Sequence, residues 1–120
     1  MTNVYVDGSG KGTFGYYIED DEVSKVIHGV DVKTHNVAEY MAIVAALKEC
    51  VKREYENITI YSDSLVVVNQ INREYAVTKD HLRVLAIEVW TILEALKAKN
   101  VSVSIVWIPR EQNKAGKMLG

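Results

Sequence analysis

The chain has 120 residues, of which 48% are hydrophobic and 25% are charged, and its formal net charge is −2. The length predicts a single domain over residues 1–120 with a hydrophobic core of its own. The composition excludes a disordered or fibrous protein, and the apolar runs fall far short of the ~20 residues that span a bilayer. The acidic balance argues against a partner held mainly through its phosphates, unless the extra acids have a local task.

The N-terminus shows no charged and apolar leader, so we expect a cytoplasmic protein. We also expect a monomer that does not associate with membranes. The one cysteine, Cys50, falls on the apolar stripe of a predicted helix. We therefore expect a buried thiol that acts as a small hydrophobic residue.

The first part of the chain predicts three strands in an antiparallel meander. Asn3–Asp7 is rich in β-branched and aromatic residues and runs into the glycine-rich stretch Gly8–Gly12, where we expect a sharp turn. Phe14–Glu19 and Val23–Lys33 predict the second and third strands, because a run of three acids between them is typical of a polar turn.

The rest of the chain predicts helices that alternate with two strands. Helical spacing of apolar residues runs from Asn36 to about Val51. The other predicted elements are a strand over Asn57–Ser62, helices over Ser64–Ile71 and Asp80–Lys99, a strand over Val101–Ile108, and a last helix from Glu111 onward. We expect Asp80 to cap the long helix and Asn100 to end it.

This order of elements is β-β-β-α-β-α-α-β-α, which is typical of an α/β protein. Three antiparallel strands followed by strand–helix units predict a five-stranded mixed sheet with helices on both faces.

Three acids lie at positions that meet at one edge of such a sheet. Asp7 ends the first strand, Glu39 lies in the first turn of the first helix, and Asp63 follows the fourth strand. Ligands of open α/β sheets bind beyond the carboxyl ends of the strands. Three converging carboxylates repel one another, and hard cations such as Mg²⁺ or Mn²⁺ relieve that repulsion. Any one of these acids alone is more often a helix cap or a solvated charge, and Asp63 is well placed to cap.

The segments around the three acids resemble the acidic motifs of ribonuclease HI. These segments are Val4–Ser9, Thr34–Ala42 and Ile60–Ser64, and the flanking Val67–Ile71 and Trp107–Asn113 resemble its compact archaeal and bacterial branch. The resemblance covers essentially the whole chain in the right order. It implies a ribonuclease H-like fold and metal-dependent hydrolysis of the RNA strand of RNA/DNA hybrids, which leaves a 5′-phosphate.

The resemblance also implies roles for individual residues. Asp7 and Asp63 would each contact metal, and Glu39 would hold one ion of a two-ion Mg²⁺ or Mn²⁺ site near the RNA. Asn36 matches a residue that contacts the minor groove of the hybrid, and Thr34 matches one that helps to hold a DNA phosphate. The full set of expected substrate-binding residues is Gly8, Ser9, Thr34, His35 and Asn36.

The family's fourth acid is replaced here, because its position, four residues after Asn113, is Lys117. We place Asn113 first as the substitute catalytic residue and metal ligand, through its amide oxygen and one helical turn earlier on the same face. Glu111 is a second candidate. Lys117 itself would instead put an ammonium group where an ion would sit.

Two further departures concern the substrate. His35 stands where the family often has an asparagine, and Leu65 stands where it often has a glutamine. Leu65 either packs inward or marks a lost contact with the substrate. The family's basic substrate-binding protrusion and its histidine after the fifth strand have no counterpart in the sequence, so we expect modest affinity.

Two other functions remain open. The first is a catalytically impaired ribonuclease H-like module that binds hybrid or RNA, which Lys117 favours and the three intact acids disfavour. The second is another nuclease of the superfamily, such as a junction resolvase or an exonuclease, which fits the fold but not the Thr34–Glu39 segment.

Overall fold

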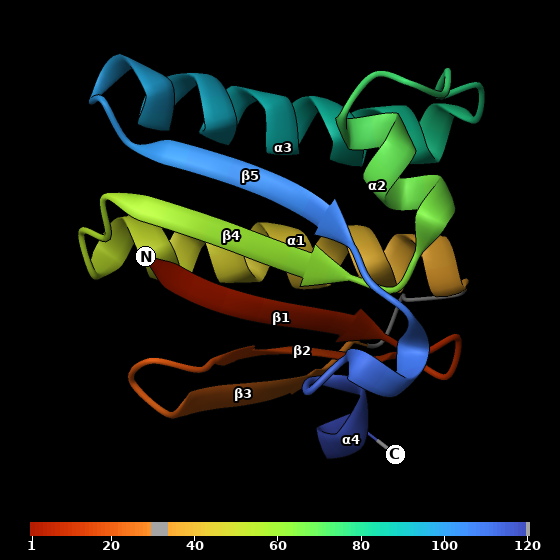
Figure 1. Cartoon of the computed structure of the whole chain (residues 1–120). Coiled ribbons are helices and arrows are strands. Elements are labelled where there is room, and N and C mark those ends of the chain that lie inside the picture. The colour runs from red at the N-terminus through yellow and green to blue at the C-terminus, as the bar shows by residue number, and fades with distance from the viewer. Residues whose placement is uncertain (30–33, 120) are drawn as a thin grey trace.

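A computed structural model describes residues 1–29 and 34–119, and within them five strands form one mixed sheet (Figure 1). The strands are β1 (Thr2–Gly8), β2 (Thr13–Ile18), β3 (Val23–His28), β4 (Asn57–Ser62) and β5 (Ser102–Trp107). Their order across the sheet is β3-β2-β1-β4-β5. The β1–β2 and β2–β3 pairs are antiparallel, whereas the β1–β4 and β4–β5 pairs are parallel. The predicted five-stranded mixed sheet is confirmed.

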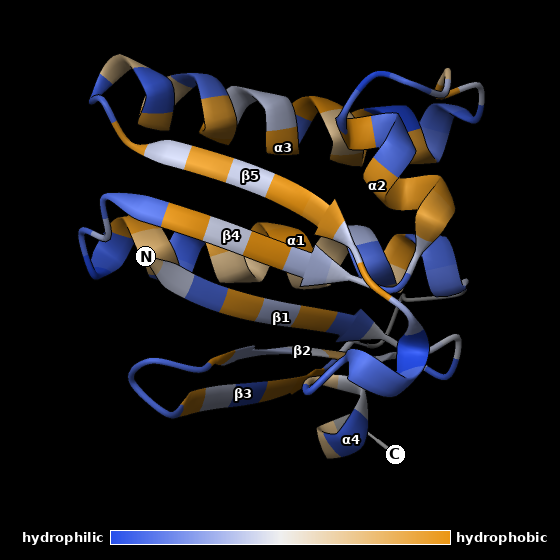
Figure 2. Cartoon of the chain, viewed as in Figure 1, coloured by the Kyte–Doolittle hydropathy of each residue, from blue (hydrophilic) through white to orange (hydrophobic). Residues whose placement is uncertain are grey.

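The helical elements are α1 (His35–Lys52), α2 (Leu65–Ile71), α3 (Asp80–Ala98), the 3-10 turn η1 (Arg110–Gln112) and α4 (Gly116–Leu119). Apolar residues alternate with polar ones along β4 (Figure 2), as a strand with one buried face requires. The core lies between the sheet and α1, where Val4, Ile60 and Leu47 are fully buried. Cys50 is also buried there, as predicted.

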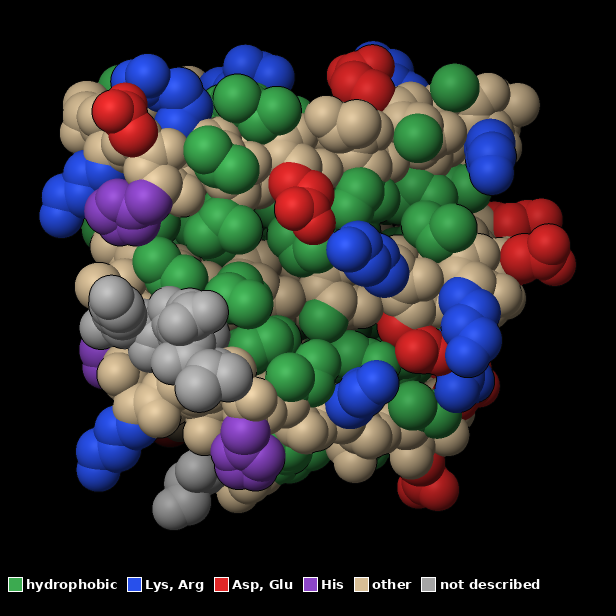
Figure 3. All heavy atoms as spheres, turned by 180° about the vertical axis from the view of Figure 1, so that it is seen from behind, with side chains coloured by type: hydrophobic (Ala, Val, Ile, Leu, Met, Phe, Trp, Pro, Cys, Tyr) green, Lys and Arg blue, Asp and Glu red, His purple; other side chains and the backbone are tan. Residues whose placement is uncertain are grey.

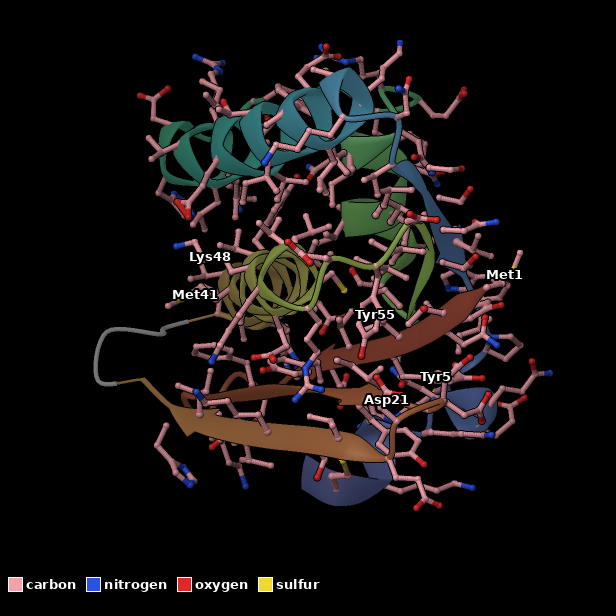
Figure 4. The ribbon with its side chains drawn as sticks, turned by 90° about the vertical axis from the view of Figure 1, so that its left-hand side faces the viewer. Met1, Tyr5, Asp21, Met41, Lys48 and Tyr55 are labelled. Carbon is pink, nitrogen blue, oxygen red and sulfur yellow. The ribbon has the colours of Figure 1, made fainter. Side chains whose placement is uncertain are left out.

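The two faces of the sheet carry different helices. Gly8 faces α1, because a Cβ built on it would lie 2.6 Å from the Cβ of Ala38. Residues on alternate positions of β1 point the other way, and there the Lys114 ammonium lies 5.5 Å from the ring centroid of Tyr5. Figure 1 shows α1 behind the sheet and the C-terminal segment crossing in front of β1. Figure 4 shows Met41 and Lys48 on the helical side of β1.

The helical face, seen from behind in Figure 3, shows apolar side chains between scattered charged ones. A groove of about 320 Å³ lies between α1 and α3, with Lys48, Val51 and Leu96 in its lining. These residues come from the C-terminal halves of both helices, so the groove does not include the three acids. Across residues 1–29 and 34–119, no helix is both long and apolar enough to span a bilayer.

Two predictions about element ends need correction. The third strand ends at His28 rather than Lys33, and Val30–Lys33 lie outside the described residues. Asp80 does not cap α3, because the N-cap is Lys79, which makes no side-chain capping bond. The predicted stop at Asn100 is confirmed: its φ of 62° is left-handed, and its N–H donates to the Lys97 carbonyl.

The predicted last helix from Glu111 is also wrong. The chain forms only the short turn η1, and Asn113 is then extended with φ −82° and ψ 105° before α4 begins. The Oδ1 atom of Asn113 accepts a hydrogen bond of 3.0 Å from the backbone N–H of Ala115. Asparagine side chains compete in this way with helical backbone bonds, so Asn113 and Lys117 do not share one helical face.

Candidate active site

The site lies at the carboxyl ends of β1 and β4, which are parallel neighbours in the sheet. Asp7 is the penultimate residue of β1, and Asp63 directly follows β4. Glu39 lies just beyond the first turn of α1, because that helix begins at His35, one residue earlier than predicted. The strands and the helix therefore bring three acids that are far apart in sequence to one edge.

Gly8 makes this convergence possible. A Cβ at this position would lie 2.4 Å from the carbonyl carbon of Ala38 and 2.6 Å from the backbone nitrogen of Glu39. Any larger residue would push α1 away from β1, and Glu39 would leave Asp7. The sharp turn expected within Gly8–Gly12 is present, and Gly12 is its left-handed residue, with φ 91°. Ser9 builds this turn, because its hydroxyl accepts from the Lys11 N–H. A substrate contact at Gly8 stays a prediction.

The carboxylates of Asp7, Glu39 and Asp63 each offer an oxygen atom within 4.8 Å of the other two. Asp7 is only 5% exposed and Glu39 only 3% exposed. Asp63 is not used as a cap, because the Ser64 hydroxyl caps α2 by accepting from the Val67 N–H at 3.3 Å. All three carboxylates are therefore available to a common ligand.

Burial in this cluster disfavours the charged forms of two of the acids. Burial above all, together with the nearby Asp7 and Asp63 carboxylates, raises the pKa of Glu39 to about 8, although the Ser62 hydrogen bond opposes this shift. Burial and the Asp63 charge raise the pKa of Asp7 to about 6, although Arg110 and His35 partly oppose this shift. Acids in structural ion pairs show the opposite shift of the pKa, so the residues that the structure describes do not supply enough positive charge to this site.

One atom shows what the cluster lacks. Glu39 Oε1 accepts a hydrogen bond of 2.7 Å from the Ser62 hydroxyl, but Oε2 is buried and has no partner among the described residues. A buried carboxylate oxygen without a partner is costly. A hard divalent cation bound by carboxylate oxygens would supply that partner, so the donor set fits such an ion.

Asn113 reaches the site, but through its nitrogen. This side chain is 1% exposed, and its Nδ2 donates to the Val6 carbonyl at 2.9 Å and to Asp63 Oδ2 at 3.0 Å. Its oxygen faces the Ala115 N–H instead. If the amide were turned over, its oxygen would face two other acceptors, the Val6 carbonyl and Asp63 Oδ2. Metal ligation by Asn113 stays a prediction, and it requires these hydrogen bonds to break.

The other candidates for the fourth position have exposed side chains. Lys117 and Glu111 are both exposed. The position that approaches the acids is Gly116, where a Cβ would lie 3.4 Å from Asp7 Oδ2. Sequence reasoning missed Gly116, because it assumed a continuous helix from Glu111.

Sequence reasoning also missed Ser62. The alternation of β4 carried the signal, because Ile58, Ile60 and Ser62 share one face of the strand and all three are buried. A serine that continues an isoleucine row toward α1 needs a hydrogen-bond partner, and Glu39 is that partner.

Three of the five expected substrate residues lie at the start of α1. The Thr34 hydroxyl caps this helix by accepting from the Val37 N–H at 3.2 Å, and His35 and Asn36 are its first two residues. Leu65 is 49% exposed, so the reading that it packs inward is wrong. Close to it, the Trp107 indole N–H donates to the Asp63 carbonyl at 3.1 Å.

Comparison with known proteins agrees with this arrangement. The profile of the family described as "Reverse transcriptase-like" matches residues 2–120. The crystal structure of RNase H1 from the halophilic archaeon Halobacterium salinarum superposes with a TM-score of 0.81 at 23% identity, covering 98% of this chain and 92% of that one. The structure of LC11-RNase H1, isolated from compost, in complex with RNA/DNA hybrid superposes with a TM-score of 0.71 at 25% identity, covering 100% of both chains.

A relative in Enterococcus faecalis, EbsB, is 28% identical over 99% of this chain and 90% of its own length, and its name gives it as a proposed hydrolase. Because the family profile spans nearly the whole sequence, the chain belongs to the Reverse transcriptase-like family. Its fold is that of ribonuclease H1, as the sequence motifs predicted.

Proposed function

We propose that this protein is a metal-dependent endoribonuclease that cleaves the RNA strand of RNA/DNA hybrids. Two observations about one carboxylate carry the proposal, at the ligand-binding edge of a ribonuclease H fold. Glu39 Oε2 is buried and has no partner among the described residues, and Glu39, Asp7 and Asp63 each offer an oxygen within 4.8 Å of the other two.

Asp7, Glu39 and Asp63 would hold Mg²⁺ or Mn²⁺. Such ions, two of them in many phosphodiester hydrolases, supply an activated water and stabilise the leaving oxygen. The protein's own contribution is a rigid and largely water-excluded set of oxygens, because β1, β4 and α1 fix the three acids independently. Arg110 lies close enough to Asp7 to lower its pKa, so its guanidinium is also suited to a substrate phosphate.

The start of α1 supports the choice of a hybrid as substrate. His35 and Asn36 are the first two residues of α1, one turn before Glu39 on the same helix. LC11-RNase H1, which shares this fold, has been crystallised with RNA/DNA hybrid. A short amide such as that of Asn36 suits the minor groove, where the RNA strand displays its 2′-hydroxyl groups.

A cleavage assay tests this proposal directly. Labelled RNA/DNA hybrid, single-stranded RNA and duplex DNA of equal length and sequence are incubated with Mg²⁺ or with Mn²⁺. We expect the hybrid alone to be cut, within its RNA strand, and EDTA to stop the reaction reversibly. Equal cleavage of single-stranded RNA would indicate a different class of nuclease.

A second candidate is an impaired module that binds hybrid without efficient cleavage. It is favoured by the acidic cluster itself, which contains three acids and not four within the described residues. Binding of hybrid with no cleavage in either metal would establish this alternative.

A further inference from the structure

Two neutral hydrogen-bond donors each hold one oxygen of a site carboxylate. The Ser62 hydroxyl donates to Glu39 Oε1 at 2.7 Å, and the Asn113 amide donates to Asp63 Oδ2 at 3.0 Å. Both donors are fully or almost fully buried. They come from separate segments, one from the last residue of β4 and one from the segment between η1 and α4.

The other oxygen of each carboxylate has no hydrogen-bond partner in the described part of the chain. Glu39 Oε2 is buried and unpartnered, and no hydrogen bond to Asp63 Oδ1 is found among the described residues. A carboxylate with one oxygen fixed cannot rotate freely, so the direction of its other oxygen is set before any ligand arrives. We propose that Ser62 and Asn113 are positioning residues that aim Glu39 Oε2 and Asp63 Oδ1 at one shared divalent cation. This inference rests on the metal site of the proposed function.

The chemistry of the donors supports this role. A lysine or arginine in either place would neutralise the carboxylate and compete with the cation, whereas a hydroxyl or an amide orients the carboxylate and leaves its charge intact. The Ser62 hydroxyl has a single proton, and its oxygen also accepts from the Ser64 N–H at 3.1 Å. That proton must therefore point at Glu39.

The surroundings of Asn113 are equally restrictive. Its nitrogen meets two acceptors, Val6 O and Asp63 Oδ2, and its oxygen meets one donor, the Ala115 N–H. All of these contacts are satisfied only with the nitrogen toward Asp63. In this arrangement Asn113 contacts the acidic cluster as a hydrogen-bond donor to Asp63.

Double-mutant cycles on metal binding test the proposal without relying on catalysis. Mn²⁺ binding to the substrate-free full chain is measured by titration calorimetry, and circular dichroism verifies the fold of each variant. We expect Ser62→Ala to weaken Mn²⁺ binding by roughly 10-fold or more, the usual effect of losing a residue that orients a metal ligand. In a Glu39→Gln background the same change should have no further effect. Asn113→Ala should behave likewise, with Asp63→Asn as its background.

Two controls separate positioning from general stability. Ser62→Thr keeps the hydroxyl and should restore most of the affinity. Ser64→Ala removes the cap of α2, so it should lower the melting temperature and leave the Mn²⁺ affinity unchanged.

Each other outcome is decisive. Losses that persist in the Glu39→Gln and Asp63→Asn backgrounds would overturn the inference, because Ser62 would then act through the fold and Asn113 through the fold or as a direct metal ligand. Unchanged affinity in the single variants would also overturn it. If the unsubstituted chain bound no Mn²⁺, the metal site of the proposed function would fail along with it. Hybrid cleavage and Mn²⁺ binding that both survive Ser62→Ala and Asn113→Ala would overturn this inference alone.

Discussion

Two glutamates on α1 lie in opposite surroundings. Glu49, near the end of the helix, accepts hydrogen bonds from the Tyr16 hydroxyl at 3.0 Å and from Arg53 Nε at 2.6 Å. These partners, Arg53 above all, lower the pKa of Glu49. Glu39, near the start of the same helix, is more deeply buried, and the Ser62 hydroxyl that donates to it is neutral, so its pKa rises to about 8.

The pairing around Glu49 extends into a network that joins separate elements. Arg53 also approaches Asp21 in the β2–β3 turn, and the Tyr55 hydroxyl donates to the same carboxylate. Figure 4 labels Tyr55 and Asp21, which tie the α1–β4 loop to that turn. Here acids hold the fold together. At Glu39, in contrast, burial of an acid without a cationic partner destabilises the native state. Such an arrangement is typical of a ligand site rather than of a structural ion pair.

Hybrid cleavage should show the largest difference between the acidic cluster around Glu39 and the ion pairs around Glu49. We expect Asp7→Asn to reduce hybrid cleavage to the level seen with EDTA while the fold survives, because it removes a ligand and a charge from the cation site. Glu49→Gln should leave cleavage nearly unchanged. Rates on a labelled hybrid, with circular dichroism of both variants, provide the measurement. Near-normal cleavage by Asp7→Asn would contradict the assignment of the site.

The pH dependence of stability should also differ between the two glutamates. The folded-state pKa of Glu39, about 8, exceeds its ordinary value of 4.5, so between these two pH values the metal-free native state holds a proton that the unfolded chain releases. The free energy of unfolding therefore falls as pH rises through this window, by up to roughly 1.4 kcal/mol per pH unit for one proton. Asp7 adds to this fall between pH 3.8 and about 6.

Glu39→Gln should remove most of this pH dependence and stabilise the metal-free protein at pH values near 8. Glu49→Gln should destabilise it there, because the lowered pKa of Glu49 stabilises the native state above its ordinary pKa and loses that effect only as pH falls. Urea denaturation across the pH range in EDTA measures both effects, and added Mn²⁺ should offset the loss of stability at high pH. If the free energy of unfolding of the unsubstituted chain did not change with pH, the raised pKa of Glu39 would be contradicted.

The sequence predicted the fold and the three acids because both follow from short-range signals. Alternation and helical spacing place the elements, and Asp7 and Asp63 stand at the ends of parallel strands whose order the pattern implies. The prediction of a last helix was wrong because a single side chain determines the backbone conformation of the C-terminal segment. The Asn113 amide oxygen accepts from the Ala115 N–H and interrupts the helix. The partners of Asn113, Val6 and Asp63, are 107 and 50 residues away along the chain, beyond the reach of any local pattern.

The smallest expected effect concerns the fourth position of the site. A Cβ at residue 116 would lie 3.4 Å from Asp7 Oδ2, an ordinary contact, and the φ of Gly116 is not left-handed, so a side chain fits there without strain. Gly116→Asp should therefore bring a fourth carboxylate to the cluster and tighten Mn²⁺ binding several-fold, at some loss of metal-free stability through repulsion.

Two matched variants show whether charge and position are the cause. Gly116→Asn has nearly the same size and no charge, so it should tighten binding much less than Gly116→Asp. Lys117→Asp changes the charge of the adjacent, exposed residue and should have little effect, because its side chain lies in solvent. Calorimetric Mn²⁺ titration of the three variants decides between the positions. If Lys117→Asp tightened binding and Gly116→Asp did not, the C-terminal segment would approach the acids in the register that the sequence first indicated, with residue 117 facing the metal.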